Sequence, residues 1–194
     1  MRYYLDTEFL DDGTQLKLIS IALVCEDGRE LYFIDSNWLG DDGRPDTTGA
    51  DDWLRENVFK HLPACTCPEH PTWRRGALDY VHNVDCKWRR RPEIARAIEQ
   101  FITVEPKEQI EVWAYYASYD WVLFCQLFGK MIDLPKHFPW LVHDLKIWSK
   151  FIGFTGRFRD LLPDVSHHEA IADARWNRDA HGILLQKFAD RKLT

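Results

Sequence analysis

RYYLDTEF, residues 2–9, joins an apolar strand pattern to two carboxylates near the start of the chain. Asp6 and Glu8 lie two residues apart, and side chains at that spacing point to the same face of a β-strand. Two carboxylates about 4 Å apart repel each other by roughly 4 kcal/mol at an effective dielectric near 20. A hard divalent cation such as Mg²⁺ prefers oxygen ligands and removes this cost. The pair therefore predicts a metal site at the end of a central strand, with a solvated acidic turn as the alternative because the acidic stretch 11–13 follows.

The composition indicates one domain with a substantial core. Of the 194 residues 45% are hydrophobic, and 9 Trp, 7 Tyr and 11 Phe can fill the interior. A net charge of −6 argues against coating nucleic acid by charge alone, but not against reaching phosphate through a bound metal. No apolar stretch reaches the ~20 residues that span a bilayer, and no signal-peptide pattern precedes the first strand. We therefore expect a cytoplasmic protein without a membrane segment; its five cysteines do not suggest a disulfide framework.

The hydrophobic patterns predict strands first and then alternating helices and strands. Residues 2–6, 16–25 and 29–35 are expected to form an antiparallel three-strand meander. Residues 36–91 break this regularity with an acidic loop, a short helix near residues 53–62 and the prolines Pro63, Pro68 and Pro71.

After this irregular region, strands and helices alternate. A helix opened by Pro92 and Glu93, a strand over 109–116 and a helix from a Ser118 cap to 128 are predicted. A weaker helix over 142–150 and a long helix over 166–190, with a capping box at its start, complete the chain. The pattern predicts an α/β fold with a mixed sheet flanked by helices.

Two further acids lie where helices begin. Asp120 follows a strand and falls in the first helical turn, where the helix dipole favours an anion by about 0.3–1 kcal/mol. Asp173 follows His168 by five residues, and such residues differ by 140° around a helix of ~3.6 residues per turn. His168 can therefore face the same site as Asp173 only if it lies at or before the helix start, where a cap at Ser166 would place it.

These segments together resemble a known superfamily. DTE at 6–8, YD at 119–120 and HxAxxD at 168–173, in this order, resemble the DEDD 3′–5′ exonucleases of the ribonuclease H-like fold, and the histidine marks the DEDDh branch. The opening MRYYLDTEF, LISI at 18–21, Trp113 and CQL at 125–127 are similar to the mycobacterial-type 3′–5′ exoribonuclease family. The resemblance covers about residues 1–35 and 92–188, so we expect a single exonuclease domain over 1–194 with an inserted region at about 36–91.

The resemblance implies an enzyme that hydrolyses phosphodiester bonds from the 3′ end of single-stranded RNA or 3′ overhangs and releases nucleoside 5′-monophosphates. Two Mg²⁺ ions, replaceable by Mn²⁺, would serve a two-metal mechanism. Asp6 would bridge them, Glu8 and Asp173 would complete the site that activates water, and Asp120 would hold the second ion directly or through water. His168 would take the proton from the attacking water. His167 is the alternative base, but only His168 fits HxAxxD.

The resemblance and the aromatic content also suggest binding partners. Besides the RNA 3′ end as substrate, a homodimer is expected. Phe9 and Leu10 follow Glu8 and could pack on terminal bases, with Tyr119 and Trp113 as further candidates, although each of these side chains could equally belong to the core. Stacking on an aromatic ring contributes about 1–3 kcal/mol per base.

Cysteines and histidines gather in the inserted region. The pattern C-x-C-x₂-H over Cys65, Cys67 and His70, followed by His82 and Cys86, could bind structural Zn²⁺. The spacing matches no common zinc finger, and free cysteine is often a small buried apolar side chain, which is the preferred interpretation here.

Two rival functions remain open. The first is a DNA-directed proofreading or repair exonuclease on the same fold. The second is a non-catalytic nucleic-acid-binding module, against which the presence of all four acids and the histidine argues. Asp144 is a weaker candidate for supporting the site from a neighbouring helix.

Overall fold

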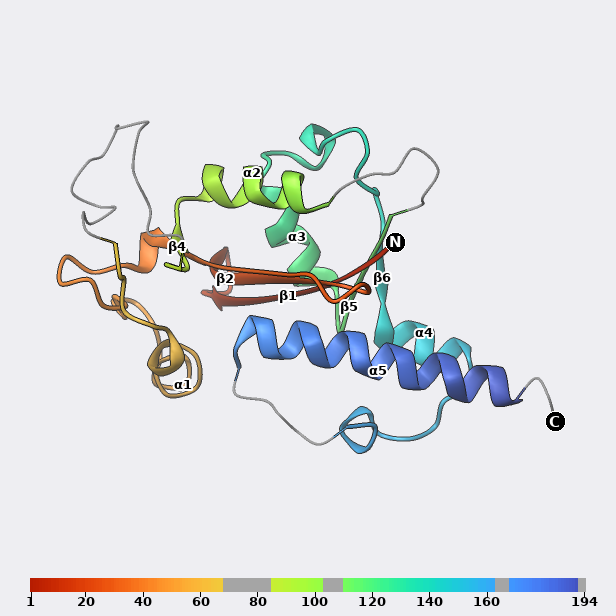
Figure 1. The fold of residues 1–194 in the computed structure, drawn as a ribbon. Helices are drawn as coiled ribbons and strands as arrows, with labels where there is room; N and C mark the ends of the chain where they lie inside the picture. The colour runs from red at the N-terminus through yellow and green to blue at the C-terminus, as the bar shows by residue number, and fades with distance from the viewer. Residues whose placement is uncertain (68–84, 103–109, 163–167, 192–194) are drawn as a thin grey trace.

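The computed structural model describes residues 1–67, 85–102, 110–162 and 168–191 (Figure 1). The expected cap at Ser166, the alternative base His167 and the histidines His70 and His82 lie outside these residues. Within the described part of the chain, no helix is both long and apolar enough to span a bilayer.

A six-stranded mixed sheet forms the centre of the fold, in the order β4-β3-β2-β1-β5-β6. Its strands are β1 (Arg2–Asp11), β2 (Leu16–Cys25), β3 (Glu30–Asp35), β4 (Trp88–Arg89), β5 (Glu111–Ala114) and β6 (Val142–Asp144). The first three strands pair antiparallel, whereas β4, β5 and β6 each join the sheet in parallel. The predicted meander followed by strand–helix units is confirmed, and the architecture is that of the ribonuclease H-like fold.

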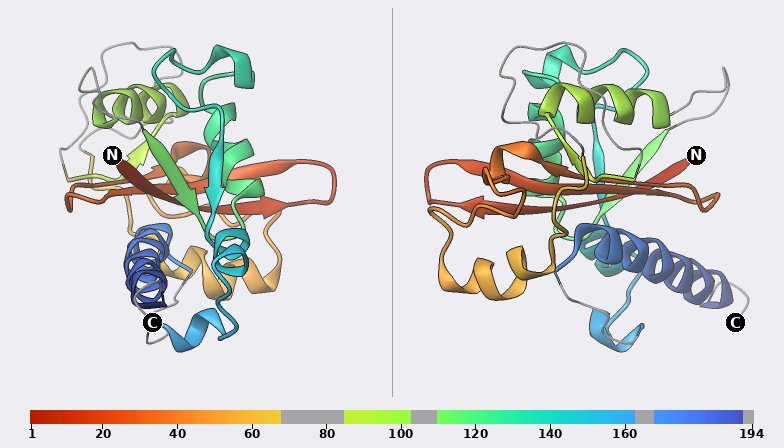
Figure 2. Two further views of the ribbon diagram at one scale, coloured as in Figure 1. Left: turned by 90° about the vertical axis from the view of Figure 1, so that its right-hand side faces the viewer. Right: turned by 60° about the vertical axis from the view of Figure 1, so that its left-hand side comes forward.

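Helices cover both faces of this sheet. The α-helices are α1 (Asp52–Asn57), α2 (Arg91–Phe101), α3 (Ser118–Gln126), α4 (Leu145–Phe151) and α5 (Ala170–Arg191). Single 3-10 turns lie at Ser36–Trp38, Phe59–His61, Met131–Asp133 and Phe158–Asp160. Helices α2 and α3 pack on one face and α5 runs across the other, with α4 beside it (Figures 1 and 2).

Three apolar clusters hold these layers together. The largest lies between the sheet and α2 and α3, and includes Tyr3, Leu5 and Phe124. The second lies between the sheet and α4 and α5, and the third packs the segment 39–62 with Cys86 and Trp88 against β2 and β3. The inserted region therefore has its own small core on the same sheet.

Several element boundaries differ from the sequence predictions. β1 does not end near Asp6, because β2 pairs with it as far as Asp11, opposite Leu16. Ser118 is not the N-cap of α3; the helix begins at Ser118, and Ala117 occupies the cap position without a side-chain bond. The predicted weak helix over 142–150 is β6 followed by α4, since Val142 to Asp144 pair with β5.

Candidate active site

The first two acids of the site lie on β1, in the middle of the sheet. Asp6 and Glu8 share a face of β1 with Tyr4, whose hydroxyl lies 2.9 Å from Nδ1 of His181 on α5. β5 pairs with β1 only from Arg2 to Tyr4, so beyond Tyr4 this edge of β1 is open to another segment. The strand continues past the acids, but its parallel pairing ends before them.

Helix α3 takes the place of β5 along that edge. The backbone N–H and the hydroxyl of Thr7 both donate to Oδ1 of Asp120, at 2.9 and 2.6 Å. Asp120 is buried in the first turn of α3, so these bonds fix its carboxylate beside β1. At this edge the backbone N–H of Thr7 is therefore hydrogen-bonded to a carboxylate rather than to another strand. This bond brings the third acid next to the first two.

The fourth acid comes from the first turn of α5. Asn177, one turn after Asp173 on the same helix, is buried and donates from Nδ2 to the carbonyl of Leu5 at 3.1 Å. Since Leu5 precedes Asp6, this bond ties α5 to β1 directly beside the acids. Potential ligand atoms of Glu8, His168 and Asp173 all lie within 4.8 Å of one another.

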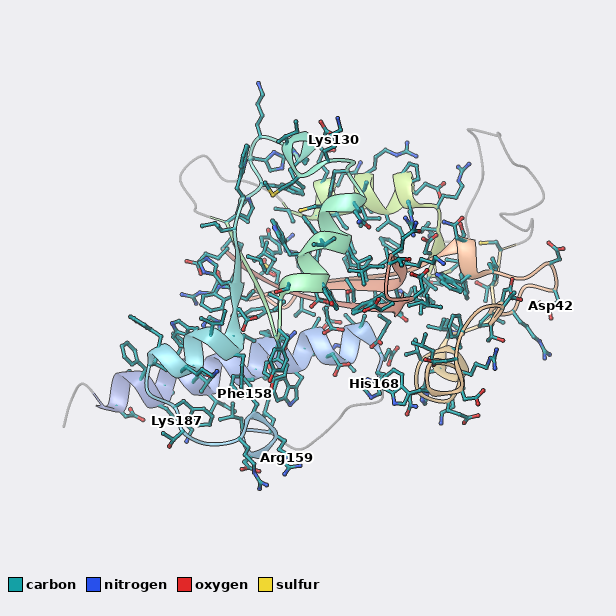
Figure 3. All side chains as sticks on the ribbon, turned by 180° about the vertical axis from the view of Figure 1, so that it is seen from behind. Asp42, Lys130, Phe158, Arg159, His168 and Lys187 are labelled. Atoms are coloured by element: carbon teal, nitrogen blue, oxygen red, sulfur yellow. The ribbon has the colours of Figure 1, made fainter. Side chains whose placement is uncertain are left out.

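His168 lies before the helix start, as the 140° argument requires. α5 begins at Ala170, and His168 has a φ of +49°. This left-handed conformation costs a non-glycine residue roughly 1–2 kcal/mol. It directs the imidazole toward Glu8 and Asp173, and strained backbone of this kind is concentrated at functional sites. His168 lies at the end of α5 that faces α1 (Figure 3).

An additional side chain that the sequence did not indicate touches the imidazole. Trp53 on α1 lies edge-on to His168, with ring centroids 4.7 Å apart and planes at 68°. Asp51 caps α1 by accepting the Leu54 N–H at 2.8 Å, and Trp53 remains 52% exposed. Nothing in the sequence relates residue 53 to residue 168. The only available signal was an aromatic side chain in a polar helix.

The carboxylates strongly perturb one another. Burial, followed by repulsion from Asp120, Asp173 and Glu8, raises the pKa of Asp6 well above its usual value. Burial and the charges of Asp173 and Asp120 raise the pKa of Glu8 to about 8. Burial raises the pKa of Asp120 to about 6, although the Thr7 hydrogen bonds oppose the shift. Full ionisation of these acids would therefore place several negative charges side by side, which a divalent cation would offset, and their oxygen donors suit Mg²⁺ or Mn²⁺.

The predicted nucleotide contacts divide into two groups. Phe9 lies edge-on to Tyr119 at 5.7 Å, and Tyr119 is 51% exposed next to Asp120. Leu10 and Trp113 are each only 6% exposed and belong to apolar clusters, with Trp113 packed against His181 at 4.0 Å. Burial thus removes Leu10 and Trp113 from the surface that could meet a base, and leaves Phe9 and Tyr119.

Asp144 supports helix ends rather than extending the acidic cluster. Its carboxylate accepts the N–H of Ala117 at 2.9 Å, just before α3, and the N–H of Ile147 at 2.9 Å, in the first turn of α4. It therefore holds the start of α3, the helix that carries Asp120.

The fold and this cluster of acids define the class of ribonuclease H-like proteins. The model of the 3′-5′ exoribonuclease Rv2179c-like domain matches residues 75–184. The chain is 33% identical over 178 residues to 3′-5′ exoribonuclease Rv2179c of Mycobacterium tuberculosis H37Rv, covering 90% of this chain and 88% of that protein. It shows the same identity and coverage with 3′-5′ exoribonuclease MT2234.1 of strain CDC 1551. The chain belongs to the Rv2179c-like 3′-5′ exoribonuclease family.

Proposed function

We propose that this protein is a metal-dependent 3′–5′ exoribonuclease of the DEDDh type, acting on single-stranded RNA ends or 3′ overhangs. The observation that carries the proposal is the convergence of β1, α3 and the start of α5 on one acidic cluster with a histidine, in a chain of this family. Membership of the family supports the RNA substrate, and the donor atoms support the metal.

The four acids would hold two Mg²⁺ or Mn²⁺ ions, with Asp6, Glu8 and Asp173 as direct ligands and Asp120 as a direct or water-mediated ligand. When bound, the ions would lower the pKa of water and offset the charge of the scissile phosphate. The chain contributes a rigid frame for them, because Thr7 fixes Asp120 and Asn177 fixes α5.

His168 would accept the proton of the attacking water. Its imidazole reaches the same space as Glu8 and Asp173, and neutral imidazole is a suitable base near physiological pH. The edge-on contact with Trp53 would restrict the orientation of the ring. Hydrolysis with water as nucleophile would release nucleoside 5′-monophosphates and leave a 3′-hydroxyl on the shortened strand.

The pair of Phe9 and Tyr119 would support the terminal base. Their edge-to-face contact keeps the exposed Tyr119 ring beside Asp120, where a base stacked on it would lie next to the metal ligands. A stack of this kind discriminates little between bases, which suits an enzyme that trims ends of varied sequence.

A homodimer and a cytoplasmic location remain further proposals. Exposed apolar side chains between residues 131 and 151 support an interface, namely Met131, Ile132, Trp140, Leu141, Ile147 and Phe151. Light scattering on the purified protein tests the dimer: a mass of one chain would exclude it.

The direct test of the function is a time course on 5′-labelled single-stranded RNA and DNA of the same sequence, with Mg²⁺, with Mn²⁺ and with EDTA. We expect a ladder that shortens from the 3′ end, faster on RNA and abolished by EDTA. Faster cleavage of DNA would favour the DNA exonuclease instead. Tight RNA binding with no cleavage under either metal would favour the non-catalytic module.

A further inference from the structure

Three cysteine sulfurs converge at a second place, in the inserted region. Cys65 and Cys67 lie beyond the 3-10 turn at Phe59–His61, and Cys86 lies just before β4. All three Sγ atoms are within 4.8 Å of one another, and those of Cys65 and Cys86 are 3.7 Å apart. The pair Cys65 and Cys86 is separated by 21 positions, so the fold rather than local sequence brings these sulfurs together.

The two chain segments that carry the thiols are held by bonds that do not involve sulfur. The indole of buried Trp88 donates to the carbonyl of Pro63 at 2.8 Å, and the N–H of Cys65 donates to the carbonyl of Gly43 at 2.8 Å. The N–H of Ile34 donates to the carbonyl of Lys87 at 2.9 Å, which attaches the second segment to the sheet. The sulfur cluster is therefore preorganised by its surroundings.

The spacing of the sulfurs discriminates between three explanations. A disulfide requires about 2.05 Å between sulfurs, far shorter than the 3.7 Å between Cys65 and Cys86. Thiols that serve only as small apolar side chains need not lie next to one another. Cys25 and Cys125, for example, lie in the main core and not in this cluster. Tetrahedral zinc with Zn–S bonds of about 2.3 Å places its sulfur ligands about 3.8 Å apart, close to the observed separation.

We propose that Cys65, Cys67 and Cys86 bind a structural Zn²⁺ ion that joins two separate segments of the inserted region. Three thiolates are a soft donor set that selects zinc, whereas the carboxylates of the acidic cluster select Mg²⁺ or Mn²⁺. A tetrahedral site would need one further ligand in addition to these three thiols. His70, the ligand expected from the sequence, lies outside the described residues.

The surroundings of Cys86 also suit a metal-bound thiolate. The backbone N–H groups of Thr66 and Trp88 donate hydrogen bonds to the Cys86 sulfur. Hydrogen bonds from backbone N–H groups to ligand sulfurs are the outer-shell contacts that structural metal sites use.

The ion would stabilise the part of the fold that carries Trp53. Cys65, Cys67 and Cys86 adjoin the same apolar cluster as Leu54 and Val58 of the α1 region. An insertion with so small a core gains stability from a metal link between two of its segments. The proposal is independent of the acidic cluster, so RNA hydrolysis can fail while zinc binding holds, or the reverse.

The test measures metal and thiols in protein purified without a histidine tag and without added metal. We expect one zinc per chain by mass spectrometry and five reactive thiols after denaturation, equal to the cysteine count. The Cys86→Ser variant should lose the zinc, whereas Cys125→Ser, a cysteine in the main core, should keep it. Substitution of cobalt should give thiolate-to-cobalt charge-transfer absorption in the wild-type protein, a readout that does not require the variants to fold.

Three results would overturn the proposal. The first is wild-type protein that contains no zinc and gives no cobalt charge-transfer band. The second is a zinc content that Cys86→Ser leaves unchanged. The third is a count of three reactive thiols, which would indicate a disulfide.

Discussion

Glu8→Gln should remove the loss of stability with rising pH that Glu8 causes in the metal-free protein. The pKa of Glu8 rises from 4.5 to about 8 in the folded chain, because the side chain is buried beside Asp173 and Asp120. The folded state therefore keeps a proton that the unfolded state releases, and its stabilising effect is fully present below pH 4.5 and lost as pH rises through about 8.

The size of the effect follows from the shift. At 1.36 kcal/mol per pKa unit, the proton on Glu8 contributes about 4 kcal/mol at pH 5 and less than about 1 kcal/mol at pH 8. Wild-type protein in EDTA should thus lose about 3 kcal/mol between these pH values through Glu8 alone, or roughly 6–12 °C in Tm for a chain of this size. Glu8→Gln, which cannot ionise, should lack this loss.

Thermal unfolding in EDTA from pH 5 to pH 8 measures how Tm changes with pH in the wild type and in Glu8→Gln. Glu99→Gln, at an exposed position on α2, is the control. Mg²⁺ or Mn²⁺ should stabilise the wild-type protein most at the higher pH, since the ions bind ionised carboxylates. If Tm depended on pH equally in the wild type and in Glu8→Gln, the reasoning that burial and mutual repulsion of the acids raise the pKa of Glu8 would be refuted.

Other contacts of the site give three more predictions. Trp53→Ala should lower kcat on RNA about tenfold through a less ordered His168, whereas the exposed Trp140→Ala should not; equal rates would show that the ring contact is incidental. Asn177→Ala should lower the free energy of unfolding by about 1–2 kcal/mol and raise the Mg²⁺ concentration for half-maximal activity. Thr7→Val, which removes the 2.6 Å bond to Asp120, should raise that Mg²⁺ concentration too; an unchanged metal titration in either variant would contradict the positioning role.

The features that the sequence predicted are those set by local patterns. Apolar runs rich in strand-forming residues indicated β2 and β3, and Pro92 with Glu93 indicated the start of α2. The spacing of His168 and Asp173 required the histidine to precede its helix, and α5 does begin at Ala170. Short-range periodicity and spacing are sufficient for these predictions because they depend on neighbours along the chain.

Most of the features that were missed depend on contacts between distant segments. Residues 142–144 become a strand only because β5 offers an edge; the extension of β1 to Asp11, by contrast, is a local hairpin contact with Leu16. Leu10 and Trp113 were candidates for stacking until the third and second apolar clusters enclosed them. The approach of Trp53 to His168 joins residues 115 positions apart, and no local pattern encodes it.

The most direct test of the central claim is the cleavage rate of Asp173→Asn on single-stranded RNA at saturating Mg²⁺. Asp190→Asn, an exposed acid near the other end of α5, is the matched control. If the acidic cluster holds the metals that hydrolyse RNA, Asp173→Asn should lose at least a hundredfold in rate, about 3 kcal/mol of transition-state stabilisation, with Asp190→Asn unchanged. A folded Asp173→Asn variant that trims RNA at the wild-type rate would contradict the account.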